Sequence, residues 1–221
     1  MADKEILILV EGPSDKVFLE VYLYFLEDIP IKNFKVKDVT GKDNLSKRLL
    51  EIEKYDKTLI IFDADKDYES NKKEILSKTQ QKITEEQIFL FPNNQDDGDL
   101  ETLLLEIAKY DEFLKCFEGY LECIKSKEHY KPIRNIRKNM LYAYLEVFEL
   151  QKFFQYKWDT NNKKNEENIT IDDKGKIKEE HQEEYEKLKE VIDFKSKSLI
   201  PLKNFLEKST ENKQKTKLKI F

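Results

Sequence analysis

The sequence predicts an α/β fold in which a mostly parallel four-stranded sheet is flanked by helices and followed by a C-terminal helical extension. In the first hundred residues, short apolar runs alternate with segments whose apolar residues recur at the spacing of a helix. Strands that alternate with helices form βαβ units, and right-handed crossovers make the sheet of such units largely parallel. The strands are expected at residues 6–10, 34–39, 58–62 and 87–91.

The first strand and the helix after it have clear boundaries. Residues Ile6 to Val10 form a continuous apolar run, as expected for a strand that is buried on both faces. Pro13 suits the first turn of a helix, where its missing N–H is not needed, and the following residues carry an apolar stripe at helical spacing. Asp15 falls in this first turn, where the helix dipole favours a carboxylate.

Two more helices are expected between the later strands. Asp43 or Asn44 can cap a helix after the second strand, because a short polar side chain accepts hydrogen bonds from the first free backbone N–H groups. Ser70 can cap a helix that runs to about Gln81 after the third strand. Pro92 stops the fourth strand, because proline cannot donate to the hydrogen-bond ladder of a sheet.

The second half of the chain is predicted to be a helical extension that packs on the sheet. This divides the chain into an α/β domain at 1–110 and an extension at 111–221. Residues 161–184 are almost wholly polar, and we expect a mobile segment there, either an insertion or an exposed hairpin and helix start. Residues 188–206 recover an apolar pattern and should pack back on the body, whereas residues 212–221 are expected to be a frayed basic tail.

Composition and charge narrow the class of protein. Charged residues make up 38% of the chain and hydrophobic residues 39%, as in soluble helix-rich proteins. The net charge of −5 excludes a globally basic surface, so contact with nucleic acid would need a local basic patch. Cys116 and Cys123 suit one face of a helix rather than a disulfide framework or a metal site, which favours a reducing cytoplasm. No apolar run approaches the roughly 20 residues of a membrane span, so no membrane contact is expected.

Acidic residues follow three of the predicted strands. Glu11 follows the first strand, Asp63 and Asp65 follow the third, and a cluster at 96–99 follows the fourth. Ligands of such sheets bind beyond the carboxyl ends of the strands. A carboxylate at the end of a buried strand is costly unless it is paired, hydrogen-bonded or coordinated, and Mg²⁺ prefers oxygen ligands. The acids therefore indicate a metal site, although each one alone could be a helix cap.

The segment Asp63-Ala64-Asp65 is the most specific part of this pattern. In an extended backbone, residues two apart point to the same side, so the two carboxylates could share one metal ion. A phosphatase with an aspartate nucleophile also places Asp-x-Asp after an apolar strand, but it would leave Glu11 and Asp15 unexplained. A plain surface turn is the remaining alternative.

The motifs EGPSD at 11–15 and DAD at 63–65, in this order after the first and third strands, resemble the Toprim domain. That domain occurs in topoisomerases, primases, small ribonucleases and OLD-family nucleases. The resemblance covers about residues 5–110 and is closest to small Toprim-like proteins grouped near the OLD-family nucleases. It implies a Toprim-like fold and a Mg²⁺-dependent (or Mn²⁺-dependent) nuclease-type reaction that cleaves phosphodiesters of nucleic acid. A Toprim-fold module that binds metal or nucleic acid without turnover is the alternative.

The resemblance also implies roles for individual residues. Glu11, Asp63 and Asp65 would be catalytic metal ligands, and Asp15 would support them. Three further acids would hold a second metal ion, namely Asp97, Asp99 and Glu101. Nucleases of this kind use a downstream lysine, and Lys138 is preferred over Lys131 because it adjoins a helical pattern, although a solvated helix face is the alternative. The chain has no Walker phosphate loop, so an ATPase partner would be a separate protein.

Overall fold

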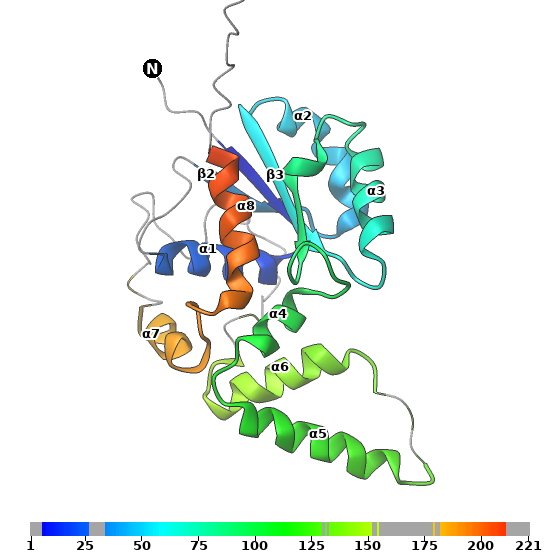
Figure 1. Ribbon diagram of the computed structural model, residues 1–221, viewed down its shortest axis with the longest axis vertical. Helices are drawn as coiled ribbons and strands as arrows, with labels where there is room; N and C mark the ends of the chain where they lie inside the picture. The colour runs from blue at the N-terminus through cyan, green and yellow to red at the C-terminus, as the bar shows by residue number, and fades with distance from the viewer. Residues whose placement is uncertain are drawn as a thin grey trace, which may run out of the picture.

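The protein has an α/β fold built on a four-stranded sheet in which all strands are parallel (Figure 1). The computed structural model describes residues 6–26, 34–129, 131, 133–151, 154, 179 and 182–210. The strand order is β2-β1-β3-β4, with bounds Ile6–Val10 (β1), Phe34–Asp38 (β2), Lys57–Asp63 (β3) and Ile88–Phe91 (β4). The predicted fold class is confirmed, and the arrangement is consistent with a Toprim-like fold.

The helices follow the strands in the predicted alternation and then continue alone. The α-helices are α1 (Pro13–Phe25), α2 (Leu49–Ile52), α3 (Tyr68–Lys78), α4 (Leu100–Glu106), α5 (Asp111–Lys125), α6 (Ile136–Val147), α7 (Gln182–Val191) and α8 (Ile200–Thr210). Short 3₁₀ helices lie at Lys42–Arg48 (η1), Glu85–Gln87 (η2) and Lys197–Leu199 (η6). No described helix has both the length and the apolar character to cross a membrane.

One face of the sheet packs against helices from both halves of the chain. Figure 1 shows α1, α7 and α8 on this side of the sheet. Apolar residues of the strands and of α1, α4, α6, α7 and α8 form one buried cluster. Phe89 of β4, for example, lies against Phe205 of α8, with ring centroids 5.5 Å apart. The predicted return of residues 188–206 to the body is therefore confirmed.

The opposite face of the sheet is covered by the η1 segment, α2 and α3. Leu7, Leu9, Ile60 and Phe62 point to this side, because alternate residues of a strand face opposite ways. Strands β1, β3 and β4 are thus buried on both faces, as their continuous apolar runs predict.

Two of the predicted helix starts are wrong. Asp67, and not Ser70, caps α3, since the Asp67 carboxylate accepts a hydrogen bond from the Ser70 N–H at 2.9 Å. The segment predicted as a helix capped by Asp43 or Asn44 is a 3₁₀ helix whose N-cap is Gly41, and only Leu49–Ile52 is α-helical. The Asn44 N–H donates to the Gly41 carbonyl at 3.0 Å, which is the shorter hydrogen-bond spacing of a 3₁₀ turn.

Helices α5 and α6 pack on each other and extend away from the sheet (Figure 1). Tyr144 of α6 anchors them to the body, since its hydroxyl donates to the Val191 carbonyl at 2.6 Å. Cys116 and Cys123 are exposed thiols on α5, as their spacing predicts for one helix. The expected mobile segment at 161–184 lies outside the described residues except at 179 and at the start of α7, and the expected tail at 212–221 lies wholly outside them.

Candidate active site at the carboxyl edge of the sheet

The ends of β1 and β3 bring two acids to the same edge of the sheet. The strands are parallel neighbours, and Val10 lies opposite Ile61. Glu11 follows Val10 directly, and Asp63 is the last residue of β3. The sequence-predicted pair Glu11 and Asp63 is thus placed at one carboxyl edge, where ligands of parallel sheets bind.

Two helix starts add further carboxylates to this edge. Asp15, in the first turn of α1, accepts a hydrogen bond from the Gly12 N–H at 2.8 Å. Asp63 accepts a hydrogen bond from the Leu100 N–H at 2.9 Å, and this bond fixes the start of α4 beside the end of β3. Glu101 follows in the first turn of α4. We call Glu11, Asp15, Asp63 and Glu101 the inner acids.

Burial and the charges of neighbouring carboxylates raise the pKa of the inner acids. Burial is the largest cause in every case. Burial raises the pKa of Asp15 to about 7; the hydrogen bond from Gly12 opposes this rise, and the charges of Glu11 and Glu101 add to it. The pKa of Asp63 rises well above its usual value, because the charges of the other three inner acids add to burial. The carboxylates therefore lie close enough to oppose one another's ionisation.

Cations act on two of the inner acids. Burial raises the pKa of Glu11, and the ammonium of Lys42 opposes this rise more than any other group. Burial also raises the pKa of Glu101, whereas the positive charges of Lys138 and Arg137 lower it. The first turn of α6, which carries both residues, thus acts on the acidic edge. Lys131, the less favoured candidate, is exposed.

One carboxylate oxygen at this edge has no satisfying contact. Glu11 Oε2 is buried, and no described residue donates a hydrogen bond of normal geometry to it, although the Asp63 N–H lowers the pKa of the Glu11 carboxyl. A buried, unpaired carboxylate oxygen is costly unless a proton or a cation compensates it. This atom is the strongest indication that the edge is built to hold a positive group.

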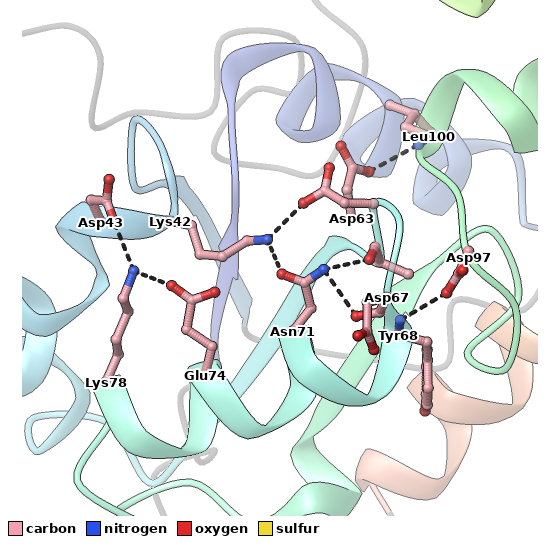
Figure 2. A network of polar contacts seen from close by, with 12 residues as sticks. Lys42, Asp43, Asp63, Asp67, Tyr68, Asn71, Glu74, Lys78, Asp97 and Leu100 are labelled. Atoms are coloured by element: carbon pink, nitrogen blue, oxygen red, sulfur yellow. Dashed lines mark hydrogen bonds and ion pairs between the residues drawn. The ribbon is translucent and has the colours of Figure 1, made fainter.

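The other three predicted acids have donors of their own, and we call Asp65, Asp97 and Asp99 the outer acids. Asp97 accepts the Tyr68 N–H at 2.8 Å (Figure 2). Asp99 caps α4 by accepting the Thr102 N–H at 2.8 Å, and it pairs with Arg137 at 2.9 Å. Asp99 is thus a helix cap, and an engaged carboxylate of this kind would have to leave a partner in order to bind a second metal ion.

The expected geometry of the Asp63-Ala64-Asp65 segment is wrong at its last residue. Asp65 has a φ of 55°, in the left-handed region, so the backbone is not extended there as the sequence predicted. The Asp65 N–H instead donates to the Gly98 carbonyl at 2.7 Å, which ties the segment to the loop before α4. Asp65 still raises the pKa of Glu11, so it faces the same edge.

Lys42 is a site residue that the sequence did not single out. Its ammonium donates to Asp65 at 2.8 Å and to the Asn71 side chain at 2.5 Å (Figure 2). The lysine follows Gly41 in the turn after β2, which ends at the same edge as β1 and β3. The sequence signal that could have identified Lys42 is a glycine followed by a lysine directly after a strand of a parallel sheet.

The chemistry of the donors fits a hard divalent cation, but their arrangement is not that of a finished metal site. Carboxylate oxygens are the ligands that Mg²⁺ and Mn²⁺ prefer, and Glu11 Oε2 is unsatisfied. Among the described residues, however, no three side chains of His, Cys, Asp or Glu are grouped closely enough to hold an ion. A metal ion at this edge would require some of the carboxylates to move closer together.

Comparison with known proteins gives a family without an assigned activity. The model of a family described as "Protein of unknown function (DUF3226)" matches residues 5–211, which include every element described above. Neither the curated proteins nor the solved structures gave a match. The function must therefore be argued from the site.

Proposed function

The chain belongs to the DUF3226 family of proteins of unknown function, and from its acidic edge we propose that it is a Mg²⁺-dependent or Mn²⁺-dependent nuclease-type enzyme that resembles the Toprim class. The observation that carries the proposal is the buried, unsatisfied Glu11 Oε2, which lies among carboxylates whose pKa values are raised by one another's charge. A divalent cation would relieve the repulsion within such a group of acids.

In this proposal the inner acids hold the metal ion. Glu11 and Asp63 come from rigid strand ends, so they can fix the position of an ion, whereas Asp15 and Glu101 sit on helix starts beside them. The bound cation would supply Lewis-acid stabilisation of the reacting phosphodiester. Asp65 contributes once it is released from Lys42, and a second ion would need Asp97 or Asp99 to leave its donor.

Basic residues beside the inner acids supply the contacts for substrate phosphates. Arg137 and Lys138 lie in the first turn of α6 and act electrostatically on Glu101. Guanidinium and ammonium groups bind phosphate oxygens by charge-assisted hydrogen bonds. We assign them to the backbone of a nucleic acid, with Lys138 in the role of the downstream lysine. They form the local basic patch that a chain with a net charge of −5 needs.

The decisive experiment is a cleavage assay with Mg²⁺ or Mn²⁺ on single-stranded and double-stranded DNA and RNA. Asp63→Asn is the test variant, because an asparagine oxygen can still accept the Leu100 N–H while the anionic ligand is lost. Asp111→Asn is the matched control, because Asp111 is a surface acid that pairs with Lys115 on α5. We expect Asp63→Asn to lower the cleavage rate at least about 100-fold and the control to leave it unchanged.

A binding module without turnover is the second candidate, and the lack of a finished ligand cluster among the described residues favours it. Under that proposal the protein binds Mn²⁺ or nucleic acid, but no member of the substrate panel is cleaved. An aspartate-nucleophile phosphatase would instead hydrolyse a phosphomonoester such as p-nitrophenyl phosphate. The electrostatic coupling of Glu11 and Asp15 to Asp63 speaks against it, because that chemistry leaves both acids without a role.

The proposal also includes a cytoplasmic location and a possible separate ATPase partner. Two exposed thiols on α5 suit a reducing cytoplasm, where they stay unoxidised. The chain carries no Walker phosphate loop, so any ATP-driven step would depend on a separate ATPase partner.

A further inference from the structure

Lys42 is aimed at the acidic edge by a strained turn. Thr40 and Gly41 both have positive φ, at 57° and 98°. The left-handed region is unfavourable for a β-branched residue such as threonine, so this backbone persists only where its surroundings hold it. The Thr40 hydroxyl donates to Asp38 at 2.9 Å, and the Gly41 N–H donates to the Glu11 carbonyl at 2.9 Å. The turn is thereby fixed to β1 at the residue that carries the unsatisfied carboxylate.

The ammonium of Lys42 is held between two acceptors of different kinds. It contacts Asp65 Oδ2 at 2.8 Å and Asn71 Oδ1 at 2.5 Å, and the Lys42 side chain is only 12% exposed. Asn71 is itself fixed, because its amide donates to the carbonyls of Ala64 and Asp67 (Figure 2). One partner of Lys42 is thus a candidate metal ligand, and the other is a neutral oxygen on α3.

The charge of Lys42 also reaches beyond its hydrogen bonds. Among the groups that act on Glu11, Lys42 makes the largest charge contribution that favours ionisation. A single ammonium therefore compensates Asp65 by contact and Glu11 through space. A divalent cation bound by these two carboxylates would do the same, and it would repel the ammonium.

We propose that Lys42 is a tethered counter-ion of the acidic edge, which competes with the divalent cation for Asp65 and Glu11. This inference rests on the proposed function, since it concerns the same metal ion. When the cation binds, the ammonium leaves Asp65 and keeps its hydrogen bond to Asn71. Lys42 thereby sets the metal concentration at which the site fills.

The opposite view is that the Lys42–Asp65 pair is a purely structural tie between the turn after β2 and the loop after β3. The two views differ in sign. If Lys42 competes with the metal ion, removal of its charge tightens metal binding. If it only holds the loops together, its removal loosens the site and weakens metal binding.

The test is a calorimetric titration of the full chain with Mn²⁺, on wild type and three variants. Lys42→Met removes the charge and keeps the length of the side chain, whereas Lys42→Arg keeps the charge. Lys78→Met is the matched control, because Lys78 pairs with Asp43 and Glu74 in the same network (Figure 2). We expect Lys42→Met to bind Mn²⁺ about tenfold more tightly, and the other two variants to bind like wild type.

The outcomes separate the inference from the proposed function. Mn²⁺ binding that is unchanged or weaker in Lys42→Met would overturn the counter-ion role and leave the proposed function standing. A wild type and a Lys42→Met variant that both ignore Mn²⁺ would overturn the proposed function and this inference with it. Acylation of lysines in the wild type gives a check that needs no variant. Labelling of Lys42 should rise as Mn²⁺ binds while that of Lys78 stays constant, and an unchanged Lys42 at saturation would contradict displacement.

Discussion

The inner and outer acids belong to the same acidic edge of the sheet, yet they differ in what surrounds them. Each outer acid has a donor at close range: Lys42 for Asp65, the Tyr68 N–H for Asp97, and Arg137 with Thr102 for Asp99. The inner acids are buried or half-buried near other carboxylates, and their pKa values are raised. The same residue type therefore has two physical roles at one sheet edge.

This difference shows how to tell a cap from a candidate ligand. Asp99 has donors at close range, because the Thr102 N–H at the start of α4 and the guanidinium of Arg137 both contact it. Asp15 and Asp63 accept a single backbone N–H each, and these bonds do not offset burial and repulsion. Only the second kind of acid requires a further positive group, so the inner acids, and not the outer ones, should dominate any response to metal.

The largest expected effect is the loss of metal-induced stabilisation in an inner-acid variant. A cation that binds only the folded protein should raise the Tm of the wild type by about 5–10 °C when Mn²⁺ reaches about 100 times its Kd. Asp63→Asn should lose most of this shift, and it should also melt slightly higher than wild type in EDTA, because one repelling charge is gone. Thermal melts with and without Mn²⁺ measure both effects, with Asp111→Asn as the control. If millimolar Mn²⁺ does not change the Tm of the wild type, the inner acids do not bind the metal ion, and the distinction between inner and outer acids as ligands fails.

The next effect is a pH dependence of stability that Asp15 contributes. The pKa of Asp15 is raised from 3.8 to about 7, so the folded protein binds this proton more tightly than the unfolded chain does. The resulting stabilisation is complete below about pH 4 and is lost as the pH rises to about 7. In EDTA, Asp15→Asn should therefore match wild type at about pH 4 and exceed its unfolding free energy by up to about 4 kcal/mol at pH 8. Urea denaturation across this pH range measures the difference in unfolding free energy between the two proteins. A difference that does not change with pH would show that folding does not raise the pKa of Asp15.

A smaller effect is expected when a cap is removed from the outer group. Asp99→Ala deletes the acceptor of the Thr102 N–H and should cost about 1 kcal/mol of unfolding free energy. Asp99→Asn keeps an oxygen at that position and should cost only a few tenths of a kcal/mol, from the lost pair with Arg137. Both variants should keep the Mn²⁺-induced rise in Tm. If Asp99→Asn loses that rise as Asp63→Asn does, the outer acids are ligands and the two groups are not distinct.

The smallest effect is expected at Asp97. Asp97→Asn preserves an oxygen for the Tyr68 N–H on an exposed loop, so its unfolding free energy should stay within about 0.5 kcal/mol of wild type. Its affinity for Mn²⁺ should also stay unchanged in the calorimetric titration. A marked loss of affinity would instead favour a second metal ion bound by Asp97.

The sheet and the position of Glu11 and Asp63 could be predicted because both follow from local pattern. Continuous apolar runs specify buried strands, and parallel strands carry their last residues to one edge. The left-handed φ of Asp65 could not be predicted, because it depends on a hydrogen bond to Gly98 that lies 33 residues away in the chain. An extended backbone was the natural expectation for a segment that continues a strand.

The hydrogen-bond donors that other helices, turns and loops bring to the acids could not be predicted from the sequence either. Lys42 meets Asp65 only because the turn after β2 and the loop after β3 end at the same edge. Ser70 was a reasonable cap by residue type, but Asp67 reaches its N–H first because the helix begins at Tyr68. Which acid is inner and which is outer is decided by these contacts, and so it belongs to tertiary structure.

The cluster that joins β1, β3 and β4 to α7 and α8 also has a consequence for the order in which the protein is made. During synthesis, Phe91 at the end of β4 is added to the chain more than a hundred residues earlier than Leu206 of α8. At typical elongation rates the nascent chain carries every acid of the site for roughly 10 s while one face of its sheet still lacks α7 and α8. Phe89 and its neighbours are open to chaperones and proteases during that interval, and a message truncated before codon 182 would leave them so permanently.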